Sequence, residues 1–456
     1  MTRPAVRRAW CAAPVGLPAM APTERRVSFA APGLPMVAFA VALVLTASVV
    51  ASALAAPSSA AAAARPPEVS APAAIVVEAS TGDVTYRLNA GQRRPIASTT
   101  KLMTALLTLR RVRLDETFVA PPYDPAPAES RVNLRTGEAL TVRDLLRAML
   151  LASANDAAVT LARGVAGTTE DFVGDMNREA RRLGLRDTSY ANPVGLDDPA
   201  NYSTARDLAA LALVLRRSAF ARRTTDLERA TLRSGARVRQ IVNRNELLGE
   251  EGWVDGVKTG FTSSAGYVLV GSATRGPVTV ISVVLGERSE AARNRDSLSL
   301  LRYGLSRYRS VRPVRRGEVL ARPGVRLRGS LTVPVVPTRS SSHVVRRGRR
   351  VTVRERLPSV LEGPLPAGRR VGTVLVRAGR RVIDRVPLVT GAAVPVPSSS
   401  ERVKHAVLRP WLAVALAAFL LLLAAGSLLL VQARRRRRRR QDGRRAKARA
   451  RPGTPA

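Results

Sequence analysis

The stretch from Ala97 to Thr104 reads ASTTKLMT. The chain has 74 basic residues among 456, but lysine occurs at four positions: Lys101, Lys258, Lys404 and Lys447. Ser98 and Lys101 are three residues apart, so a helix beginning at or just before Ser98 would put both side chains on one face. A buried lysine can lose its proton and activate a serine hydroxyl, whereas arginine cannot. The motif alone also fits a solvated lysine after a serine N-cap, but the leucines and methionine around Lys101 favour burial.

The composition restricts the chemistry that the chain can perform. Its hydrophobic content of 46% is enough for a sizeable core. The single cysteine is Cys11, and the two histidines are His343 and His405. A Ser-His-Asp triad, a Cys-His dyad and a His/Cys zinc site are therefore excluded from residues 72–312.

The net charge of +40 permits several interpretations. It is compatible with a nucleic-acid partner, with an anionic membrane or wall, or with a coding bias towards arginine. Aromatic residues make up 4% of the chain, which is too few for a base-stacking surface. We therefore expect no nucleic-acid partner, and the near-total replacement of lysine by arginine favours a coding bias at most positions.

The N-terminal residues have the pattern of an export signal. Arg25 and Arg26 precede an apolar run over 36–54 that closes in small residues. Residues 1–55 are thus predicted to be a secretory signal peptide, or an uncleaved signal anchor. Residues 56–71 are rich in Ala, Pro and Ser and are predicted to be a linker.

Residues 72–312 combine strand-type and helix-type patterns. The stretch AAIVVEASTGDVTYRLN predicts a hairpin, and AGYVLVGSA and PVTVISVVLGE predict two later strands. Helical spacing lies between them, and Ser203 is a plausible N-cap of the third helix. The predicted helices cover 102–109, 141–166 and 203–218. Strands at both ends around helices predict an α+β domain with one antiparallel sheet.

The C-terminal third changes character twice. Residues 313–397 alternate short Val-rich runs with Gly, Pro and Arg, which predicts a small all-β domain. A linker over 398–410 leads to 411–431, an uncharged stretch that as a helix would be about 31 Å long and would cross a bilayer. Residues 432–456 include seven consecutive arginines, Arg434–Arg440, which predict a cytoplasmic tail.

Two further polar motifs accompany Ser98 and Lys101. Lys258 and Thr259 offer a cation and a hydroxyl to a carboxylate, and Gly260 would let a ligand backbone approach closely. Ser153 and Asn155 form a polar pair in an apolar helical context. A buried turn that satisfies its own backbone would explain this pair equally well.

In chain order, Ser-x-x-Lys, Ser-x-Asn and Lys-Thr-Gly form the motif set of class A β-lactamases and penicillin-binding proteins. The segments RRPIASTTKLMT, LLASANDAAVTLA, NPVGLDDPANYSTARDLA and WVDGVKTGFTSSAGYVLVGSA narrow the resemblance. Over residues 72–312 the chain resembles the low-molecular-mass penicillin-binding proteins, the D-alanyl-D-alanine carboxypeptidases. More weakly, LEGPLPAGRRVGTVLVRAGRRVIDRVPLV resembles the β-sandwich that follows in that family. Val194 departs from the polar residue that relatives often carry.

This resemblance implies a fold and a set of partners. The expected α+β fold is a five-stranded antiparallel sheet packed with helices, plus a helical subdomain, a small β-sandwich and a C-terminal transmembrane helix. The expected substrates are peptidoglycan stem peptides ending in D-Ala-D-Ala, and the expected inhibitors are β-lactams. The C-terminal helix would anchor the chain in the cell membrane with the catalytic domain outside, and neither a cofactor nor a metal is expected.

The resemblance also implies catalytic roles. Ser98 would be the acylated nucleophile and Lys101 the base that activates it. Ser153 would pass a proton to the departing D-alanine, and Asn155 would hold the substrate amide.

Substrate binding falls to a second group of residues. By resemblance, Lys258 and Thr259 would bind the terminal carboxylate beside Gly260. The backbone N–H of Phe261 would form the oxyanion hole with that of the nucleophile, and Arg288 would add positive charge near the carboxylate.

Other functions use the same residues. A class A β-lactamase needs a carboxylate to activate the deacylating water, and no glutamate stands in such a motif between Asn155 and Lys258. An endopeptidase or transpeptidase would use the same acyl-enzyme and stays open. A noncatalytic wall-binding protein would not need three intact motifs.

Overall fold

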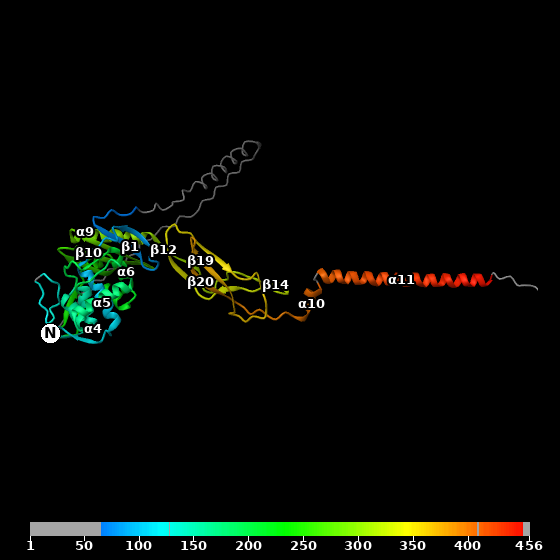
Figure 1. Ribbon diagram of the computed structural model, residues 1–456, viewed down its shortest axis with the longest axis horizontal. Helices are drawn as coiled ribbons and strands as arrows, with labels where there is room; N and C mark the ends of the chain where they lie inside the picture. The colour runs from blue at the N-terminus through cyan, green and yellow to red at the C-terminus, as the bar shows by residue number, and fades with distance from the viewer. Residues whose placement is uncertain (1–64, 127, 408–409, 450–456) are drawn as a thin grey trace, which may run out of the picture. The chain divides into compact units, whose positions relative to one another are not determined.

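The computed structural model describes residues 65–126, 128–407 and 410–449 (Figure 1). The predicted signal segment, residues 1–55, lies outside the described residues, and so does most of the predicted linker 56–71. The described part of that linker has almost no regular structure before the first strand begins at Ala73.

One antiparallel five-stranded sheet organises the first folded region, in the order β2-β1-β11-β10-β9. Its strands are β1 (Ala73–Glu78), β2 (Val84–Leu88), β9 (Val254–Thr262), β10 (Gly266–Arg275) and β11 (Val278–Glu287). The first two form the predicted hairpin, which pairs with β11 from Ala73↔Leu285 to Glu78↔Val280. The first strand of the chain is thereby joined to strands almost 200 residues later.

Both faces of this sheet are covered. Alternate residues of β1 enter two different cores: Ala73, Ile75 and Val77 one, and Ala74 and Val76 the other. This alternation follows from the two-residue period of a strand. The helix α9 (Glu290–Ser306) contacts β10 and β11, and α6 (Ala205–Leu215) contacts β1 and β11. The predicted mixture of helices and sheet in one fold is therefore confirmed.

The remaining helices form the larger of these two cores. They are α2 (Lys101–Arg111), α3 (Val142–Leu151), α4 (Asn155–Ala166), α5 (Thr169–Arg182), α7 (Ala219–Thr225) and α8 (Leu247–Glu250). Short strand pairs connect them: β3 (Arg94–Pro95) with β6 (Tyr202–Ser203), β4 (Thr117–Val119) with β5 (Ala139–Thr141), and β7 (Arg229–Leu232) with β8 (Arg239–Val242).

Two details of the helix predictions are wrong. The N-cap of α6 is Thr204, whose hydroxyl accepts from Asp207 N at 3.1 Å, whereas Ser203 belongs to β6. The helix predicted over 141–166 is two helices, because the chain turns at Ser153 with φ 62°. A left-handed residue cannot continue an α-helix, so the apolar periodicity on either side concealed the break.

Strands prevail from Tyr308 to Thr390. Residues β12 (Tyr308–Val314), β13 (Gly324–Val325), β14 (Arg328–Thr332), β15 (Val335–Pro337), β16 (Ser341–Arg346), β17 (Val351–Arg356), β18 (Val360–Leu361), β19 (Arg370–Ala378) and β20 (Arg381–Thr390) make up this part. They form a four-stranded sheet β15-β20-β19-β17, a three-stranded sheet β14-β13-β18 and the pair β12-β16. A separate valine-rich core includes Val374, Val376, Val386 and Leu388.

Two helices follow. The first, α10 (Ser399–Val407), lies within the predicted linker 398–410. The second, α11 (Pro410–Arg449), contains a candidate membrane span at Trp411–Arg444 with a mean hydropathy of 2.7 and no burial within the protein. The helix continues through the seven arginines (Figure 1).

Gly195 lies against the turn that carries Ser98. Its φ is +91°, and a Cβ there would lie 2.0 Å from the carbonyl oxygen of Ala97. Backbone lies on both sides of this contact, so neither side can rotate away. The loop that contains Gly195 therefore fits the turn only without a side chain.

We predict that Gly195→Ala lowers the melting temperature far more than Gly137→Ala. Gly137 has a φ of +83° with nothing within 4 Å of its Cβ position, so this control carries the left-handed cost alone. That cost is about 1 to 2 kcal/mol, or roughly 2–8 °C for a region of this size. Thermal unfolding of both purified variants measures the difference, and equal shifts would show that the Ala97 contact has no energetic weight.

Candidate active site

Ser98 lies in a single 3₁₀ turn, Ala97–Thr100, that leads directly into α2. The turn begins with Ala97 at φ 46°, and the Thr99 hydroxyl donates to Ile96 O at 2.6 Å. Buried residues of α2, among them Leu102 and Met103, anchor it in the core. The nucleophile candidate therefore has a fixed position at the start of a rigid helix.

Lys101 is fully buried, as its apolar neighbours predict. Its Nζ atom is 2.9 Å from Ser98 Oγ, 2.6 Å from Asn155 Oδ1 and 2.5 Å from Val194 O. An ammonium group has three hydrogens, so these three contacts exhaust its donors. A neutral amine has two hydrogens, which can stay on the amide and carbonyl oxygens, and its lone pair then faces the Ser98 hydroxyl.

The surroundings of Lys101 favour the neutral form. Its pKa lies well below the ordinary value because burial penalises the charged form, and the positive charge of Lys258 lowers it further. Glu129 and Asp156 oppose this shift with their negative charge, while Arg244 adds to it. Lys101 thus has the chemical properties of a base within reach of a serine hydroxyl.

Ser153 and Asn155 lie where α3 ends and α4 begins. Ser153 is buried in the left-handed turn between the helices, and Asn155 is the first residue of α4. The backbone N–H of Asn155 donates to Ser130 O at 2.7 Å. The break in the predicted helix therefore brings the Asn155 side chain to Lys101, which a continuous helix would not do.

The strand β9 brings the third motif beside Ser98. A Cβ on Gly260 would lie 2.8 Å from the backbone nitrogen of Ser98, so only glycine leaves this N–H accessible from the strand. Lys258 and Thr259 are both buried, and Lys258 Nζ donates to Thr259 O at 3.0 Å. Burial, followed by the charges of two arginines, lowers the pKa of Lys258 to about 7.

The two remaining predicted residues lie at the surface. Phe261 is 56% exposed, and its ring centroid is 4.4 Å from that of Tyr267 on the neighbouring strand. Arg288 follows directly after the end of β11 and is exposed. Within the described residues its side chain makes no hydrogen bond or ion pair, so the structure does not bring it into the network around Lys101.

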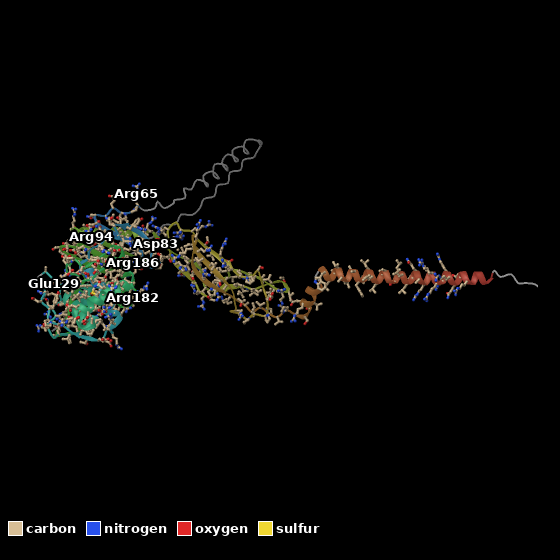
Figure 2. All side chains as sticks on the ribbon, viewed as in Figure 1. Arg65, Asp83, Arg94, Glu129, Arg182 and Arg186 are labelled. Carbon is tan, nitrogen blue, oxygen red and sulfur yellow. The ribbon has the colours of Figure 1, made fainter. Side chains whose placement is uncertain are left out.

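Sequence reasoning missed Glu129, which is labelled in Figure 2. Its carboxylate accepts from Asn155 Nδ2 at 2.7 Å, from the Tyr123 hydroxyl, and from Ala126 N at 2.9 Å. The Asn155 amide is therefore held from both ends, with Oδ1 towards Lys101 and Nδ2 towards Glu129. No pattern marked Glu129 in advance, since it lies 26 residues before Asn155 in a loop without periodicity.

A cavity of about 580 Å³ adjoins this network. Tyr123 and Val194, which contact Glu129 and Lys101, also line it. Most of its other walls come from the helical part of the fold and include Val159, Arg163, Val173 and Leu196. Among the described residues, no cluster of three or more His, Cys, Asp or Glu side chains is arranged to hold a metal ion.

The sequence matches the peptidase family S11, D-alanyl-D-alanine carboxypeptidase, over residues 60–289. It is 29% identical to D-alanyl-D-alanine carboxypeptidase DacF of Bacillus subtilis, over 70% of this chain and 84% of the relative. It is 32% identical to D-alanyl-D-alanine carboxypeptidase DacC of Escherichia coli, over 70% of this chain and 83% of the relative.

Solved structures agree with these matches. Penicillin binding protein 5 from Haemophilus influenzae is similar with a TM-score of 0.54 and 28% identity, over 73% of this chain and all of that one. A Streptomyces DD-transpeptidase is similar with a TM-score of 0.51 and 33% identity, over 53% of this chain and 99% of that one.

We predict that Glu129→Gln moves the rising limb of the pH–rate profile for acylation by a penicillin towards lower pH. The carboxylate raises the pKa of Lys101, so its removal lets the amine lose its proton at lower pH. Glutamine can still accept from Asn155, so the plateau rate should change little. Glu129→Ala also removes that acceptor and should slow acylation by roughly 10- to 150-fold at every pH.

Glu170→Gln is the matched control, because Glu170 is an exposed carboxylate beside the same cavity with no bond to Asn155. Its profile should coincide with that of the unmodified chain. A profile for Glu129→Gln that also coincides would remove Glu129 from the network that governs Lys101.

Proposed function

The chain belongs to the D-alanyl-D-alanine carboxypeptidase family S11, and from this we propose that it removes the terminal D-alanine from peptidoglycan stem peptides through an acyl-enzyme on Ser98. One observation carries the proposal: a fully buried lysine amine lies 2.9 Å from the serine hydroxyl. A lysine in these surroundings can be neutral near physiological pH and can accept the serine proton.

Acylation begins at this pair. Neutral Lys101 takes the hydroxyl proton while Ser98 Oγ attacks the carbonyl carbon of the penultimate D-alanine. The oxygen of that carbonyl acquires negative charge and is stabilised by the backbone N–H groups of Ser98 and Phe261. The missing side chain at Gly260 leaves room for this oxygen beside Ser98 N.

Collapse of this intermediate releases D-alanine. The proton held by Lys101 must reach the departing amine, and Ser153, buried in the turn beside Asn155, relays it. Asn155 holds the substrate amide with the Nδ2 hydrogen that Glu129 does not use. Water then attacks the acyl-enzyme, and Lys101 again serves as the base.

Recognition of the substrate terminus falls to β9. Protonated Lys258 and the Thr259 hydroxyl bind the terminal carboxylate, and Arg288 adds positive charge from the end of β11. Burial lowers the pKa of Lys258 to about 7 in the empty site. A substrate carboxylate favours the charged form, so binding itself raises that pKa.

Transpeptidation is the second candidate. A Streptomyces relative is called a D-alanyl-D-alanine carboxypeptidase by sequence and a DD-transpeptidase in its crystal structures. Both reactions pass through the same acyl-enzyme and differ in whether water or an amine accepts the acyl group. An endopeptidase activity would differ only in the leaving amine.

For the organisation of the chain we propose a catalytic domain at 72–312 and a β-sandwich domain at 313–397. The strands, cores and sheets described above support both boundaries. Residues 1–55 would direct export as a signal peptide or signal anchor. Residues 411–431 would span the membrane, leaving the arginine-rich residues 432–456 in the cytoplasm.

Incubation of the full-length chain with diacetyl-Lys-D-Ala-D-Ala tests the activity. We predict D-alanine release and covalent labelling by a fluorescent penicillin, with both lost in Ser98→Ala. Lys101→Arg should lose both by orders of magnitude, because arginine has a pKa above about 12 and cannot accept the proton. Cross-linked product in place of free acid would favour transpeptidation, and labelling of Ser98→Ala would exclude Ser98 as the nucleophile.

Protease protection tests the topology. Protease added to intact cells should digest residues 72–397 and spare an epitope tag placed after Ala456. Digestion of that tag in sealed cells would contradict a cytoplasmic tail, whereas permeabilised cells, in which the tag must become accessible, provide the control.

A further inference from the structure

The catalytic proposal leaves most of the positive charge unexplained. Residues 313–397 contain 18 arginines, no lysine and four acidic residues, a net charge of +14 over 85 positions. Residues 72–312 contain 35 basic and 26 acidic residues, a net charge of +9 over 241 positions. A coding bias towards arginine acts on the whole chain and does not account for the scarcity of acidic residues in one part of it.

These arginines lie at the surface of the β-rich part. Fifteen of the 18 are exposed, and Figure 2 shows their nitrogen atoms along its strands. Within the described residues, four form ion pairs: Arg326, Arg328, Arg339 and Arg346. The other 14 have no carboxylate partner there, so their charge is available to an external anion.

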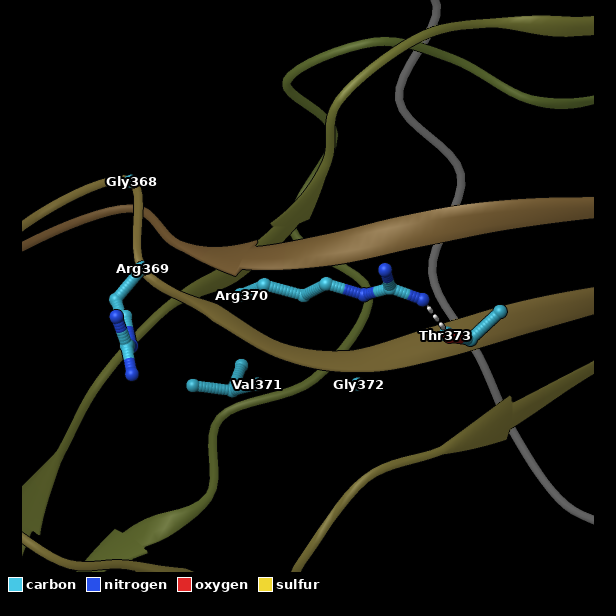
Figure 3. Close-up of a pocket in the computed structure, with 6 residues that line it drawn as sticks. All are labelled: Gly368, Arg369, Arg370, Val371, Gly372 and Thr373. Atoms are coloured by element: carbon cyan, nitrogen blue, oxygen red, sulfur yellow. Dashed lines mark hydrogen bonds between the residues drawn. The ribbon is translucent and has the colours of Figure 1, made fainter.

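One group of them borders a cavity at the end of the β19–β20 hairpin. The cavity, of about 580 Å³, is lined by residues 368–373 and includes Arg369 and Arg370 (Figure 3). The Arg370 side chain runs along the strand towards Thr373, whose hydroxyl accepts from its Nη2 at 3.4 Å. Arg356 pairs with Thr373 on the neighbouring strand, which brings a third exposed guanidinium to this corner.

This corner is also where the chain leaves the β-rich part for the membrane helix. Thr390, the last residue of β20, accepts from Gly368 N at 2.7 Å and donates its backbone N–H to Arg369 O at 3.0 Å. The candidate span begins at Trp411, 21 residues later, and nine residues between them form α10. A connection of this length reaches at most about 55 Å, so the corner cannot move far from the bilayer surface.

We propose that the Arg356, Arg369 and Arg370 corner binds the phosphodiester headgroups of anionic phospholipids in the membrane that α11 anchors. Guanidinium groups are suited to phosphate because their parallel N–H groups match its oxygens. The short connection keeps the headgroups at an effective concentration in the millimolar range, so weak individual contacts suffice. The inference rests on membrane anchoring by α11 and is independent of the reaction at Ser98.

The same hairpin supplies a matched control. Arg380 and Arg381 form its other turn and are equally exposed. Eight residues of β19 separate the two ends, about 26 Å at roughly 3.3 Å per residue. Electrostatic attraction decays over about 8 Å at physiological ionic strength, so headgroups that contact Arg369 exert little force on Arg380.

The experiment uses the full-length chain in lipid nanodiscs, with Cys11→Ser and a fluorophore on Ala367→Cys in the exposed turn next to Gly368. Nitroxide on the lipid headgroups quenches the fluorophore when the corner is at the surface. We expect stronger quenching in discs containing about 30% phosphatidylglycerol than in phosphatidylcholine discs, and loss of the difference at high salt. Arg369→Gln with Arg370→Gln should reduce the bound-to-free ratio roughly 30-fold, whereas Arg380→Gln with Arg381→Gln should leave it unchanged.

Three results would overturn the inference. Equal quenching in neutral and anionic discs excludes headgroup charge as the cause. Equal loss in the two double variants excludes a site at this corner. Displacement by millimolar inorganic phosphate would show that a soluble phosphate, rather than the membrane, is the ligand. Failure of the chain to insert into discs would instead disprove anchoring by α11, and penicillin labelling of each variant verifies that the catalytic fold is intact.

Discussion

A lysine amine buried without a carboxylate bonded to it is the constraint on which this site depends. Burying an unpaired charge costs several kcal/mol, and loss of the proton avoids that cost. The three oxygens around Lys101 come from a hydroxyl, an amide and a backbone carbonyl. Each requires a local irregularity: the 3₁₀ turn before α2, the left-handed turn at Ser153, and the glycine after Val194 that lets its loop contact that turn.

Strong periodic patterns made much of the fold predictable. The hairpin at the N-terminal end of the fold, the late strands β10 and β11, the strand-rich C-terminal part and the apolar helix α11 follow from runs of residues whose side chains all experience the same environment. The motif residues were predictable for another reason. Ser98, Lys101 and Lys258 carry chemistry that arginine or alanine cannot replace, and this made them recognisable before their positions were known.

The features that escaped prediction depend on contacts between distant segments. Apolar periodicity continues through the break between α3 and α4, because both helices bury their faces in one core, and only the left-handed Ser153 reveals the turn. Glu129 acquires its role from an asparagine 26 residues away, and neither residue signals the other in the sequence. Thr204 rather than Ser203 caps α6, a choice between two adjacent hydroxyls that the strand pairing of Ser203 decides.

The absent side chain at Gly260 limits how such an enzyme could evolve resistance to an antibiotic. A Cβ at this position would lie 2.8 Å from the Ser98 nitrogen, in the space that the carbonyl oxygen of any acyl donor must occupy. A β-lactam ring and a peptide present the same oxygen there, so obstruction of this space would exclude drug and substrate together. Selectivity has to arise where the two molecules differ, at walls farther from the reacting carbonyl. The cavity beside Tyr123 and Val194 is one such wall, and its variation would let the two be distinguished without loss of catalysis.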